Sequence, residues 1–305
     1  MKNKELRKLL EKQHYSFIDE NSAIKICTWA KKSLLDEGFC YKEQFYGIKS
    51  HLCCQISTTI GYCQNRCIFC WRPVEYTLGN KINNNYNPKE LIKKAISAQR
   101  KQISGIKGNK KVNLKKFLEA QEPKHFAISL SGEPLIDNNL NKLIKELKKQ
   151  GKTTFVVTNG LLPDRLEKIE APTQLYLSLD APNKELFEKI DKPVIKDAWK
   201  KLNESLLILR KLKKKTRTVL RITLIKNMNM IEPENYAKLI EKADPNFVEV
   251  KAYMYVGYSQ QRLSIESMPR HPEIQEFSKQ ISKHLHNYKI IDEKKESRVV
   301  LLGRS

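Results

Sequence analysis

The 305-residue sequence has no run of eighteen apolar residues and no apolar stretch behind its basic N-terminus. A membrane-spanning helix needs about 20 mostly apolar residues, and a secretory signal needs an apolar segment after its first charges. The sequence therefore predicts neither feature, and we expect no membrane partner. Hydrophobic residues still make up 40% of the chain, which is enough for a sizeable core and argues against disorder.

Cysteine is missing from the whole chain beyond Cys70, and all seven cysteines stand between Cys27 and Cys70. A secreted disulfide scaffold would need an even number of cysteines, spread over the chain. The crowding instead indicates a reducing, cytoplasmic compartment in which thiolates bind metal.

Acidic residues are scarce relative to basic ones: 34 Asp and Glu stand against 57 Lys and Arg, which gives a net charge of +23. Such an excess attracts polyanions, and nucleic acid is the leading class of partner. A lysine-rich but otherwise ordinary protein would show the same excess. Two segments without any acid concentrate the charge, residues 101–116 and 208–221, and we interpret the first as an exposed basic loop or insertion.

Three cysteines, Cys63, Cys67 and Cys70, stand in one short stretch at C-x3-C-x2-C spacing. Thiolates at this density hold zinc, copper or an iron–sulfur cluster. A structural zinc site needs four ligands, usually in two separated pairs, whereas three cysteines on one loop leave one metal corner open. Three structural cysteines or a partial zinc knuckle are the alternatives. With the aromatic Phe69 before the last cysteine, the loop resembles the signature of the radical S-adenosylmethionine enzymes. In that family the open iron of a [4Fe-4S] cluster chelates S-adenosylmethionine, and reduction releases a 5′-deoxyadenosyl radical.

Apolar strands alternate with helices from about residue 52 onward. Strands are predicted at 52–57, 125–130, 153–158, 174–179, 218–224, 247–254 and 299–302, and helices at 88–104, 137–150, 161–169, 183–190, 197–213, 233–243 and 272–286. This rhythm predicts a parallel sheet covered on both faces, either a partial or full α/β barrel or a doubly wound open sheet. Two further helices are predicted at 3–13 and 21–36, the second ended by Gly38 and containing Cys27.

We therefore expect an α/β fold of the radical S-adenosylmethionine type, a partial or incomplete (β/α) TIM-like barrel with an N-terminal helical extension. A single domain is expected over residues 1–305. Its N-terminal helices and the upstream cysteines would occupy residues 1–55, and the barrel would span about 50–302.

Ligands of parallel α/β folds bind where strands end. Three predicted strand ends carry small or polar residues: Ser-Gly-Glu-Pro at 131–134, Asn159 and Ser178. Each is also explained by a tight turn or a helix cap. In the radical S-adenosylmethionine family the counterpart of 131–134, usually Gly-Gly-Glu-Pro, holds the methionyl amino group, and the other two ends lie by the ribose and the carboxylate. The resemblance thus assigns Glu133, Asn159 and Ser178 to cofactor binding, with serine replacing the first glycine.

Cys27, Cys40 and Cys53 form a second set at C-x12-C-x12-C spacing, with Cys54 beside the last. Buried thiols without function are the alternative. Followed by C-x3-C-x2-C, this arrangement resembles the tRNA 4-demethylwyosine synthases. The resemblance runs from about residue 20 to 302 and includes the segments 40–51, 70–73, 178–182, 250–259 and 268–271.

The resemblance implies an S-adenosylmethionine-dependent lyase of wyosine biosynthesis. Such an enzyme condenses the N1-methylguanosine next to the anticodon of tRNA-Phe with two carbons of pyruvate. It implies two [4Fe-4S] clusters, one on Cys63, Cys67 and Cys70 and one on Cys27, Cys40 and Cys53. The first would make the radical that abstracts hydrogen from the N-methyl group, and the second has an open iron that could chelate pyruvate.

A lysine that forms a Schiff base with pyruvate is the alternative to an iron–pyruvate complex. Lys42, two residues past Cys40, is the best candidate in the sequence, ahead of Lys49 and Lys251. For any one of these lysines, simple solvation at the surface is the competing interpretation.

A tRNA substrate would explain the excess of positive charge. Residues 101–116 and 208–221 are then candidate surfaces for contacts with tRNA phosphates. Some aromatic residues near strand ends are candidates for stacking on a base or simply for core packing: Trp71, Tyr253, Tyr255 and Tyr258. The chain has no room for the flavodoxin-like domain that some relatives carry. It resembles the short archaeal form, and we expect a monomer that takes electrons from a separate flavodoxin or ferredoxin.

Two other functions are the alternatives. Another radical S-adenosylmethionine enzyme, such as a protein activase, would leave the charge and the upstream cysteines unexplained. A non-catalytic, zinc-stabilised RNA-binding protein would leave the series of strand-end motifs unexplained.

Overall fold

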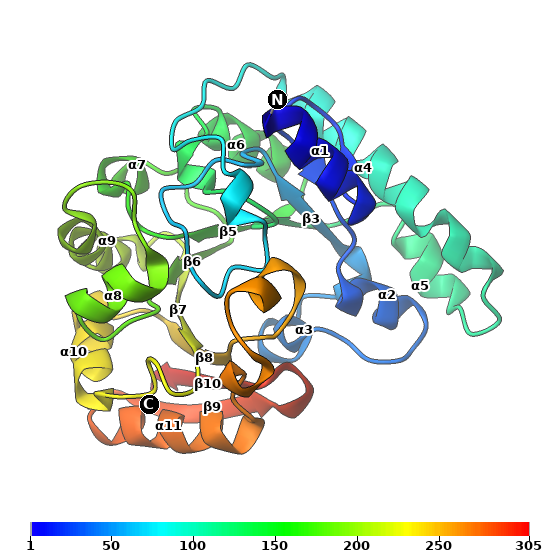
Figure 1. Cartoon of the computed structure of the whole chain (residues 1–305). Helices are drawn as coiled ribbons and strands as arrows, with labels where there is room; N and C mark the ends of the chain where they lie inside the picture. Colours follow the sequence, from blue (N-terminus) through cyan, green and yellow to red (C-terminus); the bar gives the residue numbers. More distant parts are fainter. Residues whose placement is uncertain (1, 305) are drawn as a thin grey trace. The chain divides into compact units, whose positions relative to one another are not determined.

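The computed structural model describes residues 2–304, and the chain divides into two units (Figure 1). The first unit contains the chain up to Cys63 together with Leu78–Val156. The second contains Gln64–Thr77 and the chain from Val157 onward. The boundary passes through the cysteine loop, so that Cys63 belongs to the first unit and Cys67 and Cys70 belong to the second.

The first unit is a small mixed sheet with helices packed on it. Its helices are α1 (Lys2–Lys12), α2 (Thr28–Leu34), α3 (Tyr41–Tyr46), α4 (Pro88–Ile103), α5 (Leu114–Glu119) and α6 (Leu140–Lys149). Its strands are β1 (Ser16–Phe17), β2 (Ala23–Ile24), β3 (Cys53–Ser57), β4 (His125–Ile128) and β5 (Thr153–Thr158), which ends across the boundary. The strands follow the order β1-β2-β3-β4-β5, with parallel pairs from β3 to β5. Helix α4 packs against β2, β3 and α6.

The second unit contains the later strands and their helices. The helices are α7 (Pro163–Glu167), α8 (Lys184–Asp191), α9 (Ala198–Leu212), α10 (Pro233–Ala243) and α11 (His271–Lys283). The strands are β6 (Gln174–Ser178), β7 (Arg217–Leu224), β8 (Phe247–Ala252), β9 (Tyr288–Lys294) and β10 (Val299–Arg304), in the order β6-β7-β8-β10-β9. Helix α9 packs against α7 and α10, while α11 lies along β9 and β10 (Figure 1).

The predicted alternation of strands and helices is confirmed from β3 to α11. Continuous apolar runs explain this success, since Leu175, Tyr176 and Leu177 of β6 are completely buried, as strands covered on both faces are. Helix α10 begins at the predicted Pro233, because proline suits the first position of a helix.

The helix predicted over residues 21–36 is wrong in its first part. Ala23 and Ile24 form β2 and pair with Ser57 and Ile56 of β3, so that tertiary pairing overrides the local helical pattern. The helix begins only at Thr28, which makes Cys27 its N-cap rather than an interior residue. It ends at Leu34, ahead of the predicted stop at Gly38.

The segment 101–116 is not the single exposed loop that was predicted. Helix α4 continues to Ile103, a 3-10 turn spans Ser104–Gly108, and α5 begins at Leu114. Ile103 is buried in a cluster with Phe117 and with residues of α2, which anchors the segment.

Helix α3 and strand β9 were missed, and the all-parallel prediction fails at the C-terminal edge. Strand β10 runs antiparallel to both β8 and β9. Strand β9 is polar and half exposed, so it lacks the apolar run that marks the central strands. Among residues 2–304, no helix combines the length and the apolar character needed to cross a membrane.

Candidate active site

The upstream cysteines stand at the ends of three elements in the first unit. Cys27 is the N-cap of α2, Cys40 is the N-cap of α3, and Cys53 opens β3. All three are half-buried, and none of them forms a disulfide. Burial raises the pKa of Cys53 well above its ordinary value, and its neighbours Cys27 and Cys40 raise it further. The structure thus brings these three thiols into mutual electrostatic range.

Lys42 joins this group from the first turn of α3. Its ammonium lowers the pKa of both Cys27 and Cys53 against the larger effect of burial. The Nζ atom lies 5.9 Å from the centroid of the Phe155 ring. Of the two weaker candidates, Lys49 is exposed ahead of a 3-10 turn. Lys251, in the second unit, donates its Nζ proton to the Ser297 carbonyl at 2.6 Å.

A hydrogen-bond network joins Cys40 to Ser50, three residues before Cys53. The Cys40 N–H donates to Ser50 Oγ at 2.9 Å, and Ser50 donates through its hydroxyl (2.7 Å) and its N–H (2.8 Å) to Glu43 Oε2. Ser50 begins the 3-10 turn that leads into β3. The network therefore ties the start of α3 to the start of the strand.

Cys54 does not share this environment. It is completely buried, and alternation along β3 directs its side chain to the face opposite Cys53. Burial raises the pKa of the Cys54 thiol to about 12, so it stays protonated near neutral pH.

The second unit holds the greater part of the cysteine loop against the end of α8. The Arg66 N–H donates to the Asp191 carbonyl and the Ile68 N–H to the Ile190 carbonyl, both at 2.9 Å. In the opposite direction, the Val194 N–H donates to the Gln64 carbonyl at 2.8 Å. These hydrogen bonds hold the backbone of residues 64–68 against the backbone of residues 190–194.

A buried carboxylate faces one of the loop cysteines. Cys67 Sγ donates to Asp191 Oδ1 at 3.1 Å. Both Cys67 and Cys70 are half-buried, and neither forms a disulfide. Burial raises the pKa of Asp191 well above its ordinary value, and the charge of Asp180 raises it further. Sequence reasoning missed Asp191, because an acid at the end of a surface helix is too common to stand out.

Glu133 lies beside the start of the cysteine loop in the first unit. Its N–H donates to the carbonyl of Tyr62, the residue before Cys63, at 2.9 Å. The side chain is buried, and its Oε1 accepts from the Leu135 N–H at 3.0 Å. The turn depends on Gly132, where φ is +74° and a Cβ would lie 1.9 Å from the Thr59 carbonyl oxygen. The glycine of the motif is therefore obligatory here.

Asn159 reaches the loop from the end of β5. Its Nδ2 donates to the side-chain oxygen of buried Gln64 at 3.2 Å, and its Oδ1 accepts from the Leu161 N–H at 3.0 Å. Gln64 follows Cys63 directly and was not singled out in the sequence. Ser178 is the last residue of β6 and is in register with Arg221 of β7.

The chemistry of both cysteine sets fits iron–sulfur clusters. Each set offers three thiols outside any disulfide, the ligand that such clusters use, and leaves one iron corner for another ligand. Within the described part of the chain, no three histidine, cysteine or acidic side chains converge as the ligands of one metal ion would. That geometry concerns a single ion, whereas the cysteines of a cluster bind different irons.

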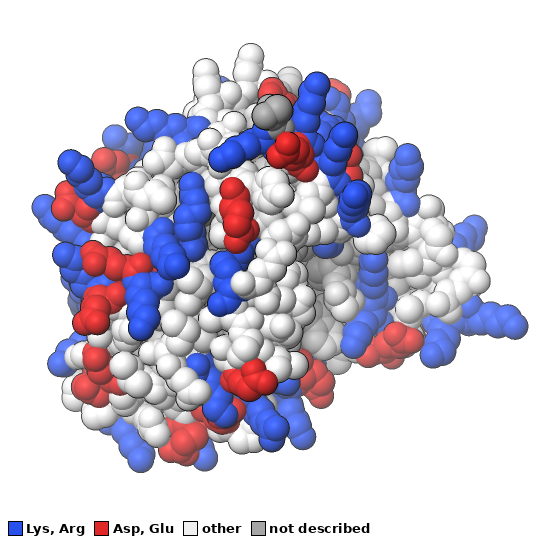
Figure 2. Space-filling view, in the orientation of Figure 1, with Lys and Arg blue, Asp and Glu red and all other residues white. Residues whose placement is uncertain are grey.

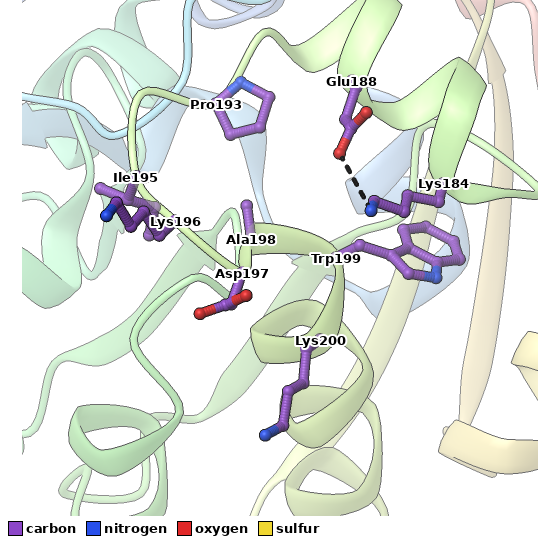
Figure 3. Close-up of a pocket in the computed structure, with 9 residues that line it drawn as sticks. All are labelled: Lys184, Glu188, Pro193, Ile195, Lys196, Asp197, Ala198, Trp199 and Lys200. Atoms are coloured by element: carbon purple, nitrogen blue, oxygen red, sulfur yellow. Dashed lines mark ion pairs between the residues drawn. The ribbon is translucent and has the colours of Figure 1, made fainter.

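A cavity of about 480 Å³ opens in the second unit between α8 and the start of α9 (Figure 3). Its lining residues are Lys184, Glu188, Pro193, Ile195, Lys196, Asp197, Ala198, Trp199 and Lys200. Lys184 and Glu188 form an ion pair at 3.7 Å, and the Trp199 ring packs 5.5 Å from the Phe187 ring. Val194, within the lining segment, is bonded to the cysteine loop, so the wall of the cavity is anchored there.

The proposed tRNA surfaces are partly used by internal ion pairs. Lys213 pairs with Asp244 at 2.6 Å, and Arg221 pairs with the completely buried Glu249 at 3.2 Å. In the first unit, Lys116 pairs with Asp36 at 2.5 Å. Of the aromatic candidates, Tyr253 is a core residue whose hydroxyl donates to Ser259. Figure 2 shows many other Lys and Arg side chains on the visible face, with fewer acidic ones among them.

Comparisons with known proteins agree with this geometry. Residues 57–240 match the radical SAM superfamily, and residues 242–304 match the wyosine base formation family. An S-adenosyl-L-methionine-dependent tRNA 4-demethylwyosine synthase of Pyrococcus abyssi is 49% identical, covering 98% of this chain and 89% of that protein. The protein of the same name from Methanocaldococcus jannaschii is 44% identical, covering 98% and 95%.

A solved structure extends the likeness to the fold. The structure of TYW1 with a lysine–pyruvate adduct bound is 41% identical, with a TM-score of 0.88 over 98% of this chain and 95% of that one. The fold class predicted from the sequence, a partial α/β barrel with an N-terminal helical extension, is thereby confirmed.

Proposed function

Because the chain belongs to the family of S-adenosyl-L-methionine-dependent tRNA 4-demethylwyosine synthases, we propose that it condenses N1-methylguanosine next to the anticodon of tRNA-Phe with pyruvate. The observation that carries the pyruvate half of this proposal is the group formed by Cys27, Cys40, Cys53 and Lys42. It offers three thiols for a second [4Fe-4S] cluster and an amine for a keto acid in one place.

Cys63, Cys67 and Cys70 would hold the first [4Fe-4S] cluster, and the chain would bind S-adenosylmethionine through the adjacent strand ends. When bound, this cluster and S-adenosylmethionine supply the organic radical that starts the reaction. The backbone contact of Glu133 with Tyr62 and the bond of Asn159 with Gln64 support their assignment, because each ties a strand end to a residue flanking Cys63. Ser178 is assigned on its strand-end position alone.

Lys42 would bind pyruvate covalently. Its deprotonated amine adds to the C2 carbonyl, and water leaves as the imine forms, which polarises the carbon skeleton for bond cleavage. The lysine–pyruvate adduct in the similar TYW1 structure supports this route over chelation of pyruvate by iron alone. The thiols beside Lys42 support it as well, since a cluster there would adjoin the bound keto acid.

The remaining partners follow from the chemistry. One electron is needed for each radical formed, and we propose a separate flavodoxin or ferredoxin as its source, acting on a monomeric chain of one domain in the cytoplasm. Transfer RNA would bind through the charge excess of the chain, with phosphate contacts positioning the anticodon loop.

The cavity between α8 and α9 is a candidate RNA contact within this scheme. Lys196 and Lys200 offer charge for phosphates at its rim, Trp199 offers an aromatic surface, and the wall is bonded to the cysteine loop (Figure 3). A Lys196→Ala/Lys200→Ala variant should weaken tRNA binding, whereas the matched variant Lys279→Ala/Lys283→Ala on α11 should not. Equal loss in both variants would point to charge alone and against the cavity.

The central experiment incubates the anaerobically reconstituted protein with dithionite, S-adenosylmethionine, pyruvate and tRNA-Phe bearing N1-methylguanosine. Digestion of the RNA should release a tricyclic nucleoside, and the protein should carry about eight irons. Release of 5′-deoxyadenosine without that nucleoside would show that the substrate is wrong.

Single cysteine variants separate the two proposed clusters. Cys67→Ala should abolish 5′-deoxyadenosine formation. Cys40→Ala should keep some uncoupled cleavage of S-adenosylmethionine but form no tricyclic product, and Cys54→Ala should keep both activities. Identical behaviour of the Cys67 and Cys40 variants would contradict separate roles.

A further inference from the structure

Arg262 contacts the cysteine loop at three backbone carbonyls. It follows the 3-10 turn Gly257–Gln261 in the second unit. Its Nε donates to the Ile68 carbonyl at 3.0 Å, and its Nη2 donates to the carbonyls of Cys70 and, at 3.3 Å, Arg72. The fixed fork of a guanidinium suits this task, because several donors point in set directions from one plane.

The position of this guanidinium is itself fixed. Nη1 donates to Glu75 Oε1 at 2.5 Å, and the Arg262 side chain is only 15% exposed. The guanidinium charge is therefore paired with Glu75, while Nε and Nη2 donate to the carbonyls of the loop.

The neighbouring turn holds the loop as well. The Tyr258 N–H donates to the Trp71 carbonyl at 3.0 Å. Gly257 allows this approach, since its φ is +60° and a Cβ would lie 2.4 Å from the Trp71 carbonyl oxygen. Together with Arg262, the turn thus binds four carbonyls between residues 68 and 72.

Apolar packing completes the contact on the same side. Ile68 lies in a buried cluster with Tyr253, and Phe69, Leu263 and Met268 pack against it. Tyr253, Leu263 and Met268, like Arg262, fall in residues 242–304, the part that matches the wyosine base formation family. Other members of the cluster belong to the part that matches the radical SAM superfamily: Leu186, Ile190, Ile225 and Met228.

We propose that Arg262 is a positioning residue for the first cluster. By fixing the peptide planes on both sides of Cys70, it keeps the Cys70 thiol in place relative to Cys67 and so retains the cluster. The wyosine-type segment thereby supports the radical centre, in addition to any part it has in substrate binding. The inference rests on the proposed assignment of Cys63, Cys67 and Cys70, and not on the pyruvate or tRNA chemistry.

The test measures cluster retention rather than turnover. Wild-type protein, Arg262→Gln and Arg262→Lys are reconstituted anaerobically and exposed to an iron chelator, and iron release is followed with time. The phase of release that disappears in Cys67→Ala identifies the first cluster. Arg262→Gln should release this phase at least about tenfold faster, as loss of an outer-sphere partner does at other metal sites. The release from the second cluster should not change.

The rate of iron release from the first cluster of Arg262→Lys should lie between the rates of wild-type protein and Arg262→Gln. Lysine keeps the positive charge but lacks the several fixed donors of a guanidinium. The matched control is Arg298→Gln, which removes an arginine donor from the Pro269 carbonyl (2.8 Å) elsewhere in the second unit. It should lower the melting temperature without accelerating release from the first cluster. The electron paramagnetic resonance signal of the reduced first cluster should broaden or shift only in the Arg262 variants.

Release from Arg262→Gln at the wild-type rate would overturn the proposal. So would equal acceleration in Arg298→Gln, since the effect would then be one of general stability. If Arg262→Gln does not fold, Arg262→Lys is compared with wild-type protein instead. Iron release from its first cluster at the wild-type rate would then overturn the proposal. A wild-type protein that forms no tricyclic nucleoside, yet loses its first cluster upon Arg262 substitution, would refute the proposed substrate and leave this inference standing.

Discussion

At the scale of single residues, the two cysteine sets differ in the charge that faces them. Lys42 lies near Cys27 and Cys53, whereas the thiol of Cys67 donates its proton to the carboxylate of Asp191. A cation favours thiolates. Asp191, whose pKa burial raises, instead offers the Cys67 thiol a hydrogen-bond acceptor. Binding of a cluster at the loop must therefore replace the hydrogen bond between Cys67 and Asp191.

Replacement of Lys42 should separate radical formation from product formation. Lys42→Arg keeps the positive charge but cannot form an imine, so the tricyclic product should fall by roughly a hundredfold or more. Formation of 5′-deoxyadenosine should persist. Mass spectrometry after borohydride reduction with pyruvate should find an adduct on wild-type protein and on the control Lys49→Arg, but none on Lys42→Arg. An adduct that persists in Lys42→Arg would exclude Lys42 as the pyruvate-binding residue.

Asp180 should make stability depend on pH. It is buried, and burial raises its pKa to about 6, although it accepts a hydrogen bond from the Thr223 N–H at 2.9 Å. Between the ordinary pKa of about 4 and this raised pKa, the folded chain holds a proton that the unfolded chain has lost. The free energy of unfolding should therefore fall as the pH rises through this window.

Asp180→Asn can keep the bond to Thr223 while losing the charge. It should reduce this slope to the share that comes from Asp191, whose pKa burial also raises, and, near neutral pH, raise the free energy of unfolding by up to about 3 kcal/mol. Urea unfolding of the metal-free protein at pH 4 to 7 measures both effects. An unchanged slope would show that Asp180 does not titrate in this window.

At the scale of elements, sequence patterns were reliable where the pattern was local. The apolar run of β6 and the proline at the start of α10 sufficed to predict both elements. Strand β2 and strand β9 were missed, because one is defined by pairing with β3 and the other is a polar edge strand.

The same limit applies to the site. The six cluster cysteines could be proposed from spacing, because cysteines on one loop or at regular intervals give a local signal. Gln64, Asp191 and Arg262 could not, since their contacts with the site join residues far apart in the sequence. The sequence neighbours of Asp191 and Arg262 do not distinguish them from ordinary polar residues, and Gln64 has only its position after Cys63 to mark it.

Gly132 provides a test of the turn after β4. Gly132→Ala would place a methyl group against the Thr59 carbonyl in a left-handed backbone conformation, so the free energy of unfolding should fall by roughly 3 kcal/mol or more. Gly105→Ala is the matched control, because its methyl group would meet nothing within 4 Å, and it should change stability by less than about 1 kcal/mol. Urea unfolding of both variants measures the difference. Equal stabilities would mean that the 131–134 turn can relax.

At the scale of the whole molecule, charge is the dominant property. The net charge of +23 is what remains after every acidic residue is counted against a basic one, and basic side chains outnumber acidic ones on the face that Figure 2 shows. An excess of this size attracts a long polyanion more strongly than it attracts a small ligand.

Binding of tRNA should therefore depend steeply on salt. With six to ten phosphate contacts, the association constant for tRNA should fall by a factor of roughly 10³ to 10⁵ between 50 and 200 mM salt. Fluorescence anisotropy with labelled tRNA at several salt concentrations measures the slope. A binding constant that barely changes would contradict phosphate contacts as the main source of affinity.

The contacts of Arg262 with the cysteine loop also set an order of events during synthesis. The arginine and the Cys70 carbonyl that it holds are 192 residues apart in the chain. At about 5–20 residues per second, a ribosome needs roughly ten to forty seconds to make the intervening residues. During this interval the loop thiols have left the ribosome while the contacts from Arg262 are still missing. The nascent chain therefore exposes these thiols to oxidation. Cluster insertion is therefore expected to follow completion of the chain, and truncated chains that end before Arg262 should accumulate oxidised loops.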